Sequence, residues 1–318
     1  MSIDLSDLDK RILMALEYDF PLDKEPYRVL AQRFGLSENE LLEKVKNYIH
    51  DGIVKRIGMY VSFRAKGMDS ALVAAQIPEN KIDFFRRKAL EIKEITHNYI
   101  RIHPRYNVWY VIKAENRDAL NNKIRTLMEE VGAVDYVILY SEQTLKLSVK
   151  FDIIRGISYS EAYVPKDTGR VDANPELLKV LSYPLPLVPR PFKEVAAKLG
   201  MSEDDLIDVV IKLRERGAIR DYGATLNGEK VGIIENGMLM ISANNVAESC
   251  ENLAKIRETT HVVLRSSDKP WEYLCYAMLH AKSKKLIINV AKNIVNELDI
   301  KNYLILFSTE NLKPGIVI

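Results

Sequence analysis

The sequence predicts an α+β fold in which one unit occurs twice in tandem, a helix-turn-helix (winged-helix-like) followed by βαββαβ. The first observation behind this prediction is a set of prolines and glycines that recur at a constant offset of 165 residues: Pro21 and Pro186, Pro26 and Pro191, Gly35 and Gly200, Gly52 and Gly217, Gly58 and Gly223. The second is the order of helical and alternating hydrophobic patterns, which is the same in both copies.

The helices of the first copy follow from residue spacing and from capping residues. Leu8, Ile12 and Leu16 share one face of a helix, and Ser37 with Glu40 has the spacing of a capping box. Helices are therefore expected at residues 5–18, 27–34 and 38–50, with glycines closing the second and third, and a strand or wing is expected at 53–63. Helix, glycine turn and helix together make a helix-turn-helix.

The remainder of each copy alternates strands and helices in the order βαββαβ, which is the ferredoxin-like unit. In copy one the expected elements are residues 71–77, 81–92, 95–103, 106–114, 117–131 and 134–140. In copy two they are residues 237–242, 247–257, 262–266, 273–280, 283–298 and 303–307. The resulting domains are 1–62 and 63–150 in copy one and 173–230 and 231–318 in copy two, joined by a linker at 151–172 that is expected to be flexible over 158–170.

Composition and charge exclude several classes of protein. The chain is 47% hydrophobic and 28% charged with a net charge of +2, so it lacks the global basic field of many nucleic-acid-binding proteins. Cys250 and Cys275 are too few for a disulfide framework or a cysteine-based zinc site, and we expect them to be buried, reduced thiols. Residues 1–10 lack a secretory signal, and no uncharged apolar run approaches 18 residues. We therefore expect a cytoplasmic protein with no membrane partner.

The candidate recognition helices are acidic, which argues against DNA binding. Residues 37–46 contain three acids and two bases, and residues 202–212 contain four acids and one base. A helix that enters the major groove needs Lys or Arg to face the phosphates, and acids there repel them. We therefore expect a structural role for these helices and no nucleic-acid partner.

Unusual residues collect in the predicted hairpin of each copy. His97, Tyr99, Arg101 and His103 are spaced by two, so they project from one face of a strand. Such residues are poor core material and suggest a site, although a solvated edge face is the alternative reading. Copy two repeats the His-x3-Arg spacing with His261 and Arg265 and places His280 on the next strand, where a structural histidine is equally plausible.

These motifs resemble a known family. A helix-turn-helix followed by βαββαβ is similar to the Lrp/AsnC regulators, whose βαββαβ units pair into dimers, so two fused copies imply a covalent pseudo-dimer. The phrases THNYIRIHPRYNVW, FPLDKEPY and IVKRIG resemble one subunit type of the siroheme decarboxylases. The RPF loop resembles the other type, as does the spacing of a set of residues in copy two: His261, Arg265, Trp271, Tyr273, Met278 and His280.

The resemblance implies an enzyme that removes CO2 from the C12 and C18 acetates of siroheme, giving 12,18-didecarboxysiroheme for alternative heme biosynthesis. No cofactor is implied, because the iron belongs to the substrate. Siroheme carries eight carboxylates around an apolar macrocycle, so its pocket needs cations at the rim and apolar or aromatic walls. A proton donor with a pKa near 7 suits histidine.

The resemblance also assigns roles to candidate residues. His97 and His261 are the candidate general acids, and Arg101 and Arg265 hold carboxylates. Further substrate contacts, to carboxylates, iron or the macrocycle, are expected from Tyr99, His103, Arg105, Trp109, Trp271, Tyr273, His280, Lys55 and Arg56. For Lys55 and Arg56 a solvated role is an equal alternative. The rival function is a ligand-sensing, DNA-binding transcription regulator, and further association of chains into a homo-oligomer stays open.

Overall fold

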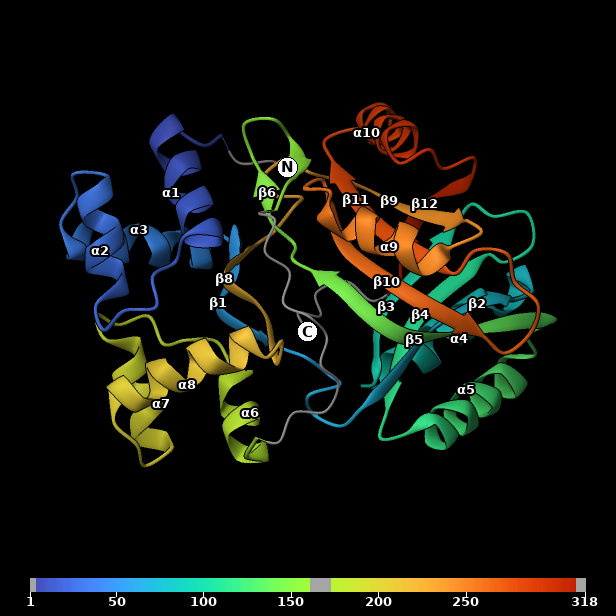
Figure 1. Ribbon diagram of the computed structural model, residues 1–318, viewed down its shortest axis with the longest axis horizontal. Helices are drawn as coiled ribbons and strands as arrows, with labels where there is room; N and C mark the ends of the chain where they lie inside the picture. Colours follow the sequence, from blue (N-terminus) through green and yellow to red (C-terminus); the bar gives the residue numbers. More distant parts are fainter. Residues whose placement is uncertain (1–3, 161–172, 313–318) are drawn as a thin grey trace.

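The computed structural model describes residues 4–160 and 173–312. Within them the protein forms a helical lobe and a sheet lobe, with a two-stranded ribbon between the two (Figure 1). Residues 161–170 of the segment expected to be flexible lie outside the described residues.

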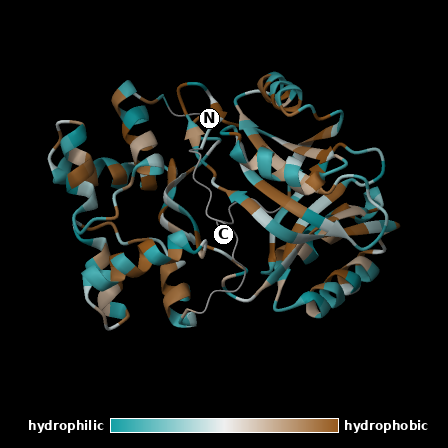
Figure 2. Cartoon of the chain, viewed as in Figure 1, coloured by the Kyte–Doolittle hydropathy of each residue, from teal (hydrophilic) through white to brown (hydrophobic). Residues whose placement is uncertain are grey.

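The helical lobe contains both helix-turn-helix units. Its helices are α1 (Asp7–Tyr18), α2 (Pro26–Arg33) and α3 (Glu38–His50) from copy one, and α6 (Pro175–Leu181), α7 (Pro191–Lys198) and α8 (Glu203–Glu215) from copy two. Ser37 and Glu40 form the predicted capping box at the start of α3, each side chain bonding to the backbone of the other residue. Hydrophilic and hydrophobic segments alternate along these helices (Figure 2), which is typical of helices that bury one face.

The strands that follow each helix-turn-helix join the two copies. β1 (Val54–Val61) and β8 (Ile219–Leu226) pair antiparallel, with Gly58 opposite Gly223. Gly223 has φ of 117°, and a Cβ atom there would lie 2.8 Å from the carbonyl oxygens of Leu16 and Glu17 in α1. The close approach of β8 to α1 therefore requires glycine at this position.

Each sheet unit has the predicted βαββαβ order. Copy one contributes β2 (Asp69–Gln76), the short helix η1 (Glu79–Lys81), α4 (Ile82–Glu91), β3 (Ile95–Arg101), β4 (Val108–Ala114), α5 (Arg117–Val131) and β5 (Asp135–Leu147). Copy two contributes β9 (Glu235–Ser242), α9 (Val246–Lys255), β10 (Thr259–Ser267), β11 (Cys275–Ala281), α10 (Lys284–Glu297) and β12 (Asn302–Asn311).

The two units combine into one sheet that closes on itself. The strand order is β10-β5-β2-β4-β3-β12-β9-β11, and β11 pairs back with β10. The last strand of each copy pairs with the first hairpin strand of the other, β5 with β10 and β12 with β3. The duplication has therefore produced the expected internal pseudo-dimer.

The closed sheet has two kinds of hydrophobic surface. Separate outer cores pack strands of copy one under α4 and α5 and strands of copy two under α9 and α10. The interior instead mixes residues of both copies, among them Leu72, Trp109 and Leu139 with Met240 and Tyr276. A side chain that points inward therefore meets the other copy.

The prediction of reduced cysteines was wrong. Cys250 on α9 and Cys275 on β11 form a disulfide, with their Cα atoms 5.7 Å apart. Both are fully buried. The packing of α9 on the sheet places the two residues within bonding range, although 25 positions separate them along the chain.

Part of the expected linker is ordered. β6 (Phe151–Asp152) and β7 (Ile157–Ser158) form a small hairpin, and β7 extends the sheet beside β11 through Ile157 and Ala281. This hairpin follows β5 directly, so the first residues of the linker belong to the sheet lobe.

Candidate active site

The strand register turns most of the predicted hairpin residues toward the interior of the closed sheet. His97 lies opposite Val111, and Tyr99 lies opposite Trp109. Directly opposed residues share a face of a sheet, and Val111 and Trp109 both belong to the interior core. His97, Tyr99 and Arg101, which alternate along β3, therefore point inward as the spacing predicted.

The predicted histidines of the two copies meet in this interior. The ring centroids of His97 and His261 are 6.2 Å apart and the rings are nearly perpendicular. Thr260 Oγ1 lies 3.2 Å from Nδ1 of His261 and 3.4 Å from Nδ1 of His280. The hydroxyl of Thr260 thus bridges two imidazoles, and in copy one Thr96 Oγ1 lies 3.3 Å from Nδ1 of His97.

Burial keeps all three histidines neutral near pH 7. It lowers the pKa of His97 to about 3, with the charges of His261, Lys113 and Arg101 contributing further. Burial likewise lowers the pKa of His261 to about 4 and that of His280 to about 3. Each of the three residues keeps partial solvent exposure.

The two predicted arginines occupy equivalent places. Arg101 donates to the carbonyl oxygen of Leu306 at 3.1 Å and stacks 4.9 Å from the Tyr99 ring centroid. Arg265 donates to the carbonyl oxygen of Leu139 at 3.0 Å and stacks 5.2 Å from the Tyr276 ring centroid. Burial lowers the pKa of each to about 10, which leaves both guanidinium groups charged at neutral pH.

Among the described residues, no Asp or Glu carboxylate forms an ion pair with either guanidinium. The Nε atom of Arg265 is buried without a hydrogen-bond partner in the part of the chain that the structure describes. A buried cation held only by neutral carbonyls and a ring is costly, and an anionic ligand would offset that cost.

His103 departs from the predicted pattern because β3 ends at Arg101. Its Nδ1 accepts the backbone N–H groups of Arg105 and Tyr106, at 3.1 and 3.0 Å. Its ring lies 5.6 Å from that of Trp109 and 6.1 Å from that of Trp271. His103 therefore joins an aromatic cluster rather than the three histidines.

This aromatic cluster gathers several of the predicted substrate contacts. Trp271 lies 6.3 Å from the ring of Tyr273 and donates through Nε1 to the hydroxyl of Tyr276 at 2.7 Å. Arg105 is exposed and pairs with Asp135 at 2.7 Å. The structure thus divides the predicted residues into a histidine–arginine group and an aromatic group, with Trp109 beside Tyr99 connecting them.

Lys55 and Arg56 lie on β1, outside the closed sheet. Lys55 is exposed. Arg56 is buried, donates to the carbonyl oxygen of Met59 at 3.0 Å and stacks 5.2 Å from the Tyr60 ring. Arg56 is therefore packed against its own strand, and neither residue contacts the histidine–arginine group.

Sequence reasoning missed Lys113 and Thr260. Thr260 precedes His261 as Thr96 precedes His97, so the repeat itself carried the signal. Lys113 would have been found by aligning WYVIKA with YAMLHA, which places it at the position of His280.

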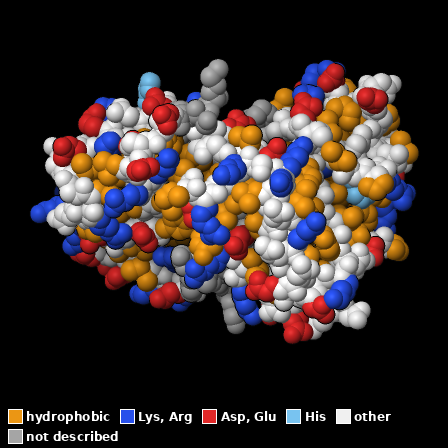
Figure 3. All heavy atoms as spheres, turned by 90° about the horizontal axis from the view of Figure 1, so that it is seen from above, with side chains coloured by type: hydrophobic (Ala, Val, Ile, Leu, Met, Phe, Trp, Pro, Cys, Tyr) orange, Lys and Arg blue, Asp and Glu red, His pale blue; other side chains and the backbone are white. Residues whose placement is uncertain are grey.

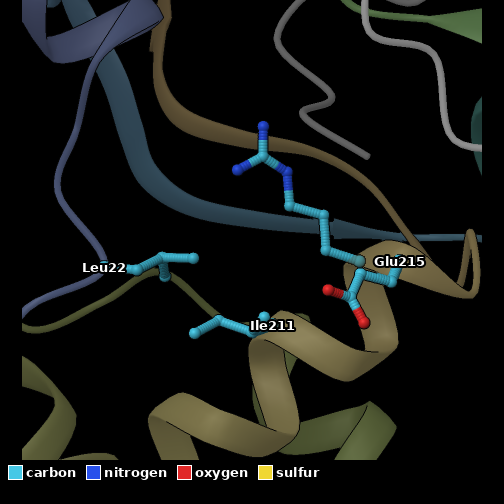
Figure 4. A pocket seen from close by; sticks show the side chains of 4 residues that line it. Leu22, Ile211 and Glu215 are labelled. Atoms are coloured by element: carbon cyan, nitrogen blue, oxygen red, sulfur yellow. The ribbon is translucent and has the colours of Figure 1, made fainter.

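Surface hollows lie elsewhere. One of about 400 Å³, in the helical lobe, is lined by Leu22, Ile211, Arg214 and Glu215 (Figure 4). Another of about 420 Å³ is lined by residues around the α7–α8 turn and by Lys24. Neither contains a predicted site residue, and both carry charges of both signs, which suits a polyanion poorly.

Among residues 4–160 and 173–312, no helix combines the length and the apolar character that a membrane span needs. In the same residues, no cluster of three or more His, Cys, Asp or Glu side chains is arranged to hold a metal ion. On the face shown in Figure 3, Lys and Arg side chains are mixed with Asp and Glu.

The fold and the site define a duplicated ligand-binding protein whose two sheet units share one interior. The family model described as an AsnC-like ligand binding domain matches residues 65–146 and 230–313, more than half of the chain. The chain therefore belongs to the family of proteins with this AsnC-like domain. A second model, described as the siroheme decarboxylase NirDL-like HTH domain, matches residues 9–54 and 175–220.

Individual relatives point to the same branch of the family. A siroheme decarboxylase of Hydrogenobacter thermophilus is 29% identical over 97% of this chain and 93% of its own length. A siroheme decarboxylase alpha subunit of Desulfovibrio desulfuricans is 30% identical over 46% of this chain and 84% of its own length. The crystal structure of the siroheme decarboxylase NirDL in complex with an iron-uroporphyrin III analogue has a TM-score of 0.64 and 27% identity, covering 97% of this chain and 92% of that one. The chain thus resembles siroheme decarboxylases with two subunits fused.

Proposed function

We propose that this chain is a siroheme decarboxylase, a carboxy-lyase that converts siroheme to 12,18-didecarboxysiroheme. The observation that carries the proposal is the meeting of His97, His261 and His280 with two charged arginines inside one closed sheet. The full-length relatives named siroheme decarboxylase support the same substrate.

The arginines suit a substrate rich in carboxylates. Arg101 and Arg265 present planar guanidinium groups that can bind a carboxylate through two parallel hydrogen bonds. Arg101 is buried and Arg265 is half-buried, and a charge pair in a poorly solvated site is stronger than the same pair in water. Tyr99, Trp109, Trp271 and Tyr273 supply aromatic surface for the macrocycle.

The histidines supply protons once the substrate is bound. Burial holds their pKa values at about 3 to 4, so the imidazoles are neutral near pH 7. A carboxylate within about 4–6 Å favours the protonated form and raises the pKa of an imidazole. The carboxylates of the bound substrate therefore raise the pKa of the histidines, which take up protons only while the substrate is in place.

Each decarboxylation consumes one proton. The bond between the acetate methylene and its carboxylate breaks, CO2 leaves, and the methylene becomes a methyl group by taking up a proton. Protonation of the adjacent ring carbon provides the electron sink for this step, and the ring carbon gives that proton back when the methyl group has formed, so the net uptake is one proton. We assign the donation to His97 and His261, and the Thr260 hydroxyl offers His280 a route to resupply His261. The iron enters with the substrate, and no resident cofactor is needed.

The rival function is a ligand-sensing transcription regulator, and one comparison separates the two. Purified protein is incubated with siroheme under anaerobic conditions while released CO2 is measured, and a gel-shift assay with genomic fragments is run in parallel. Stoichiometric CO2 release without a specific shift supports the decarboxylase. A sub-micromolar, strongly salt-dependent shift without CO2 release would establish the regulator instead.

The acidic helices favour the first outcome. The first turn of α8 carries Glu203, Asp204 and Asp205, and the first turn of α3 carries Glu38 and Glu40. We also propose that the protein works in the cytoplasm as an internal pseudo-dimer. Light scattering of the purified chain tests whether further copies associate.

A further inference from the structure

A row of polar side chains crosses the closed sheet on the copy-two side of the interior. Arg101 of β3 lies opposite Ser308 of β12, and Asn236 of β9 lies opposite His280 of β11. Ser308 Oγ donates to Asn236 Oδ1 at 3.1 Å, and Arg101 donates to the same oxygen at 3.4 Å. The row thus begins at a guanidinium and ends at an imidazole.

An equivalent row crosses the other side. Arg265 of β10 lies opposite Ser141 of β5, and Ser70 of β2 lies opposite Lys113 of β4. Since Tyr140 lies opposite Ala71, Ser141 and Ser70 are neighbours across the β2–β5 pair. This row also begins at an arginine, Arg265, but it ends at the ammonium group of Lys113 instead of an imidazole.

The surroundings of the two row ends match. The Nζ atom of Lys113 lies 5.8 Å from the ring centroid of Phe63, and the ring centroid of His280 lies 5.9 Å from that of Phe151. Both phenylalanines come from segments that connect the closed sheet to the rest of the chain. The position is therefore the same in both copies, and only the chemistry of the side chain differs.

Lys113 is a cation without a counter-charge in the part of the chain that the structure describes. Its side chain is half-buried, and no Asp or Glu of the described residues forms an ion pair with it. Burial, with a contribution from Lys66, lowers its pKa to about 8, so it is still mostly protonated at neutral pH. Its charge in turn depresses the pKa of His97, which places it within electrostatic reach of the histidines.

We propose that Lys113 binds one carboxylate of the anionic tetrapyrrole at the place where copy two presents His280. This inference rests on the proposed function and makes the two sides of the site unequal. The imidazole side supplies protons through the Thr260-linked His261 and His280, whereas on the other side Lys113 binds a carboxylate within electrostatic reach of His97. Lys113 would thereby fix which edge of the macrocycle faces His261 and His280.

The chemistry of the two end groups supports this division. An ammonium group offers three donors and a fixed charge to a carboxylate, and it can be held between a ring face and a carboxylate at once. A neutral imidazole gives a weaker grip but can gain and lose a proton near neutral pH. The site therefore has a group that binds a carboxylate, Lys113, and a group that can gain and lose a proton, His280, at equivalent positions of the two copies.

The test uses Lys113→Met and Lys113→Arg in the full chain, with Lys284→Met as the matched control. Lys284 also lies 5.8 Å from a phenylalanine ring, that of Phe307, but it stands on α10 outside the closed sheet. Absorbance titration measures the affinity for iron-uroporphyrin III, which has eight carboxylates, and for heme, which has two. CO2 release from siroheme gives KM and kcat.

We expect Lys113→Met to weaken binding of iron-uroporphyrin III about tenfold to a hundredfold, the usual loss for one charge-assisted hydrogen bond. Heme binding should weaken less, KM should rise with kcat nearly unchanged, and Lys113→Arg should restore most of the affinity. Lys284→Met should match the wild-type protein. If Lys113→Met does not fold, Lys113→Gln, which keeps a polar end, provides the same comparison.

Wild-type affinity for both probes in the folded Lys113 variants would overturn the inference while leaving the decarboxylase intact. Equal weakening for both probes would do so as well, because a residue that binds an extra carboxylate must favour the octacarboxylate. Absence of CO2 release from siroheme by the wild-type protein and by Lys284→Met would overturn the proposed function itself.

Discussion

The buried neutral histidines should make the folded protein sensitive to mild acid. Histidine in an unfolded chain has a pKa near 6.5, whereas His97, His261 and His280 have pKa values of about 3, 4 and 3 in the fold. The unfolded chain therefore binds more protons between about pH 6.5 and pH 4, and stability must fall as pH falls through that window. Above about pH 7 these groups make no difference to stability.

The size of the effect follows from the linkage relation. A shift of one pKa unit corresponds to about 1.4 kcal/mol, so lowering the pH from 6.5 to 5 costs up to about 2 kcal/mol for each histidine. Partial exposure of the three rings reduces this, and we expect about 3 to 5 kcal/mol for the three together. Replacing His280 with Gln should remove about a third of the loss.

Urea unfolding at pH 7 and pH 5 measures this loss in the wild-type protein, in His280→Gln and in His50→Gln. His50 is exposed at the end of α3, outside the closed sheet, so His50→Gln is the matched histidine control. Glu17, whose pKa burial raises, contributes in the opposite direction, but equally in all three proteins. An unchanged pH dependence in His280→Gln would show that this imidazole is not held neutral, and the account of proton loading would fail with it.

Three further outcomes are expected. His97→Ala and His261→Ala should fold normally, and each should slow decarboxylation in single-turnover assays by roughly 10²–10⁴. His261→Ala should be the milder of the two, because His280 shares Thr260 with it. Wild-type rates in both variants would remove these residues from the mechanism. Arg101→Lys keeps the charge but loses the planar fork, so siroheme binding should weaken while circular dichroism stays unchanged, and unaltered affinity would contradict the carboxylate role. Cys250→Ser should lower the free energy of unfolding by about 3 kcal/mol, as expected for a loop closed by cysteines 25 positions apart in the sequence. An unaltered urea midpoint under non-reducing conditions would show that the disulfide contributes nothing.

Local signals in the sequence predicted the helices and the element order well. The capping box at Ser37 and the helix over 117–131 were both confirmed, because capping and helical spacing are properties of a few neighbouring residues. The inward face of β3 was also predicted, since alternation along a strand determines which residues share a face.

Features that depend on contact between the copies were predicted less well. β5 was expected to end at residue 140 but continues to Leu147, because its last residues pair with β10 of the other copy. The pairing of Cys250 with Cys275 likewise depends on how α9 packs on the sheet. Residue spacing does not contain this information.

The candidate site shows the same division. The spacing of His97 and His261 with their arginines identified the main residues, and the repeat indicated a shared site. It did not predict that the two rings lie 6.2 Å apart, nor that His103 leaves the strand and joins Trp271. Both results follow from closure of the sheet, which brings opposite strands of the two copies into one interior.

The central claim is that this interior removes two carboxylates from siroheme without an added cofactor. Its most direct test is anaerobic incubation of the purified chain with siroheme alone, followed by mass spectrometry of the extracted tetrapyrrole. The account predicts two successive losses of 44 mass units, one CO2 for each acetate, with the iron retained. Recovery of unchanged siroheme that had nevertheless bound to the protein would contradict it and leave a tetrapyrrole-binding protein that is not a decarboxylase.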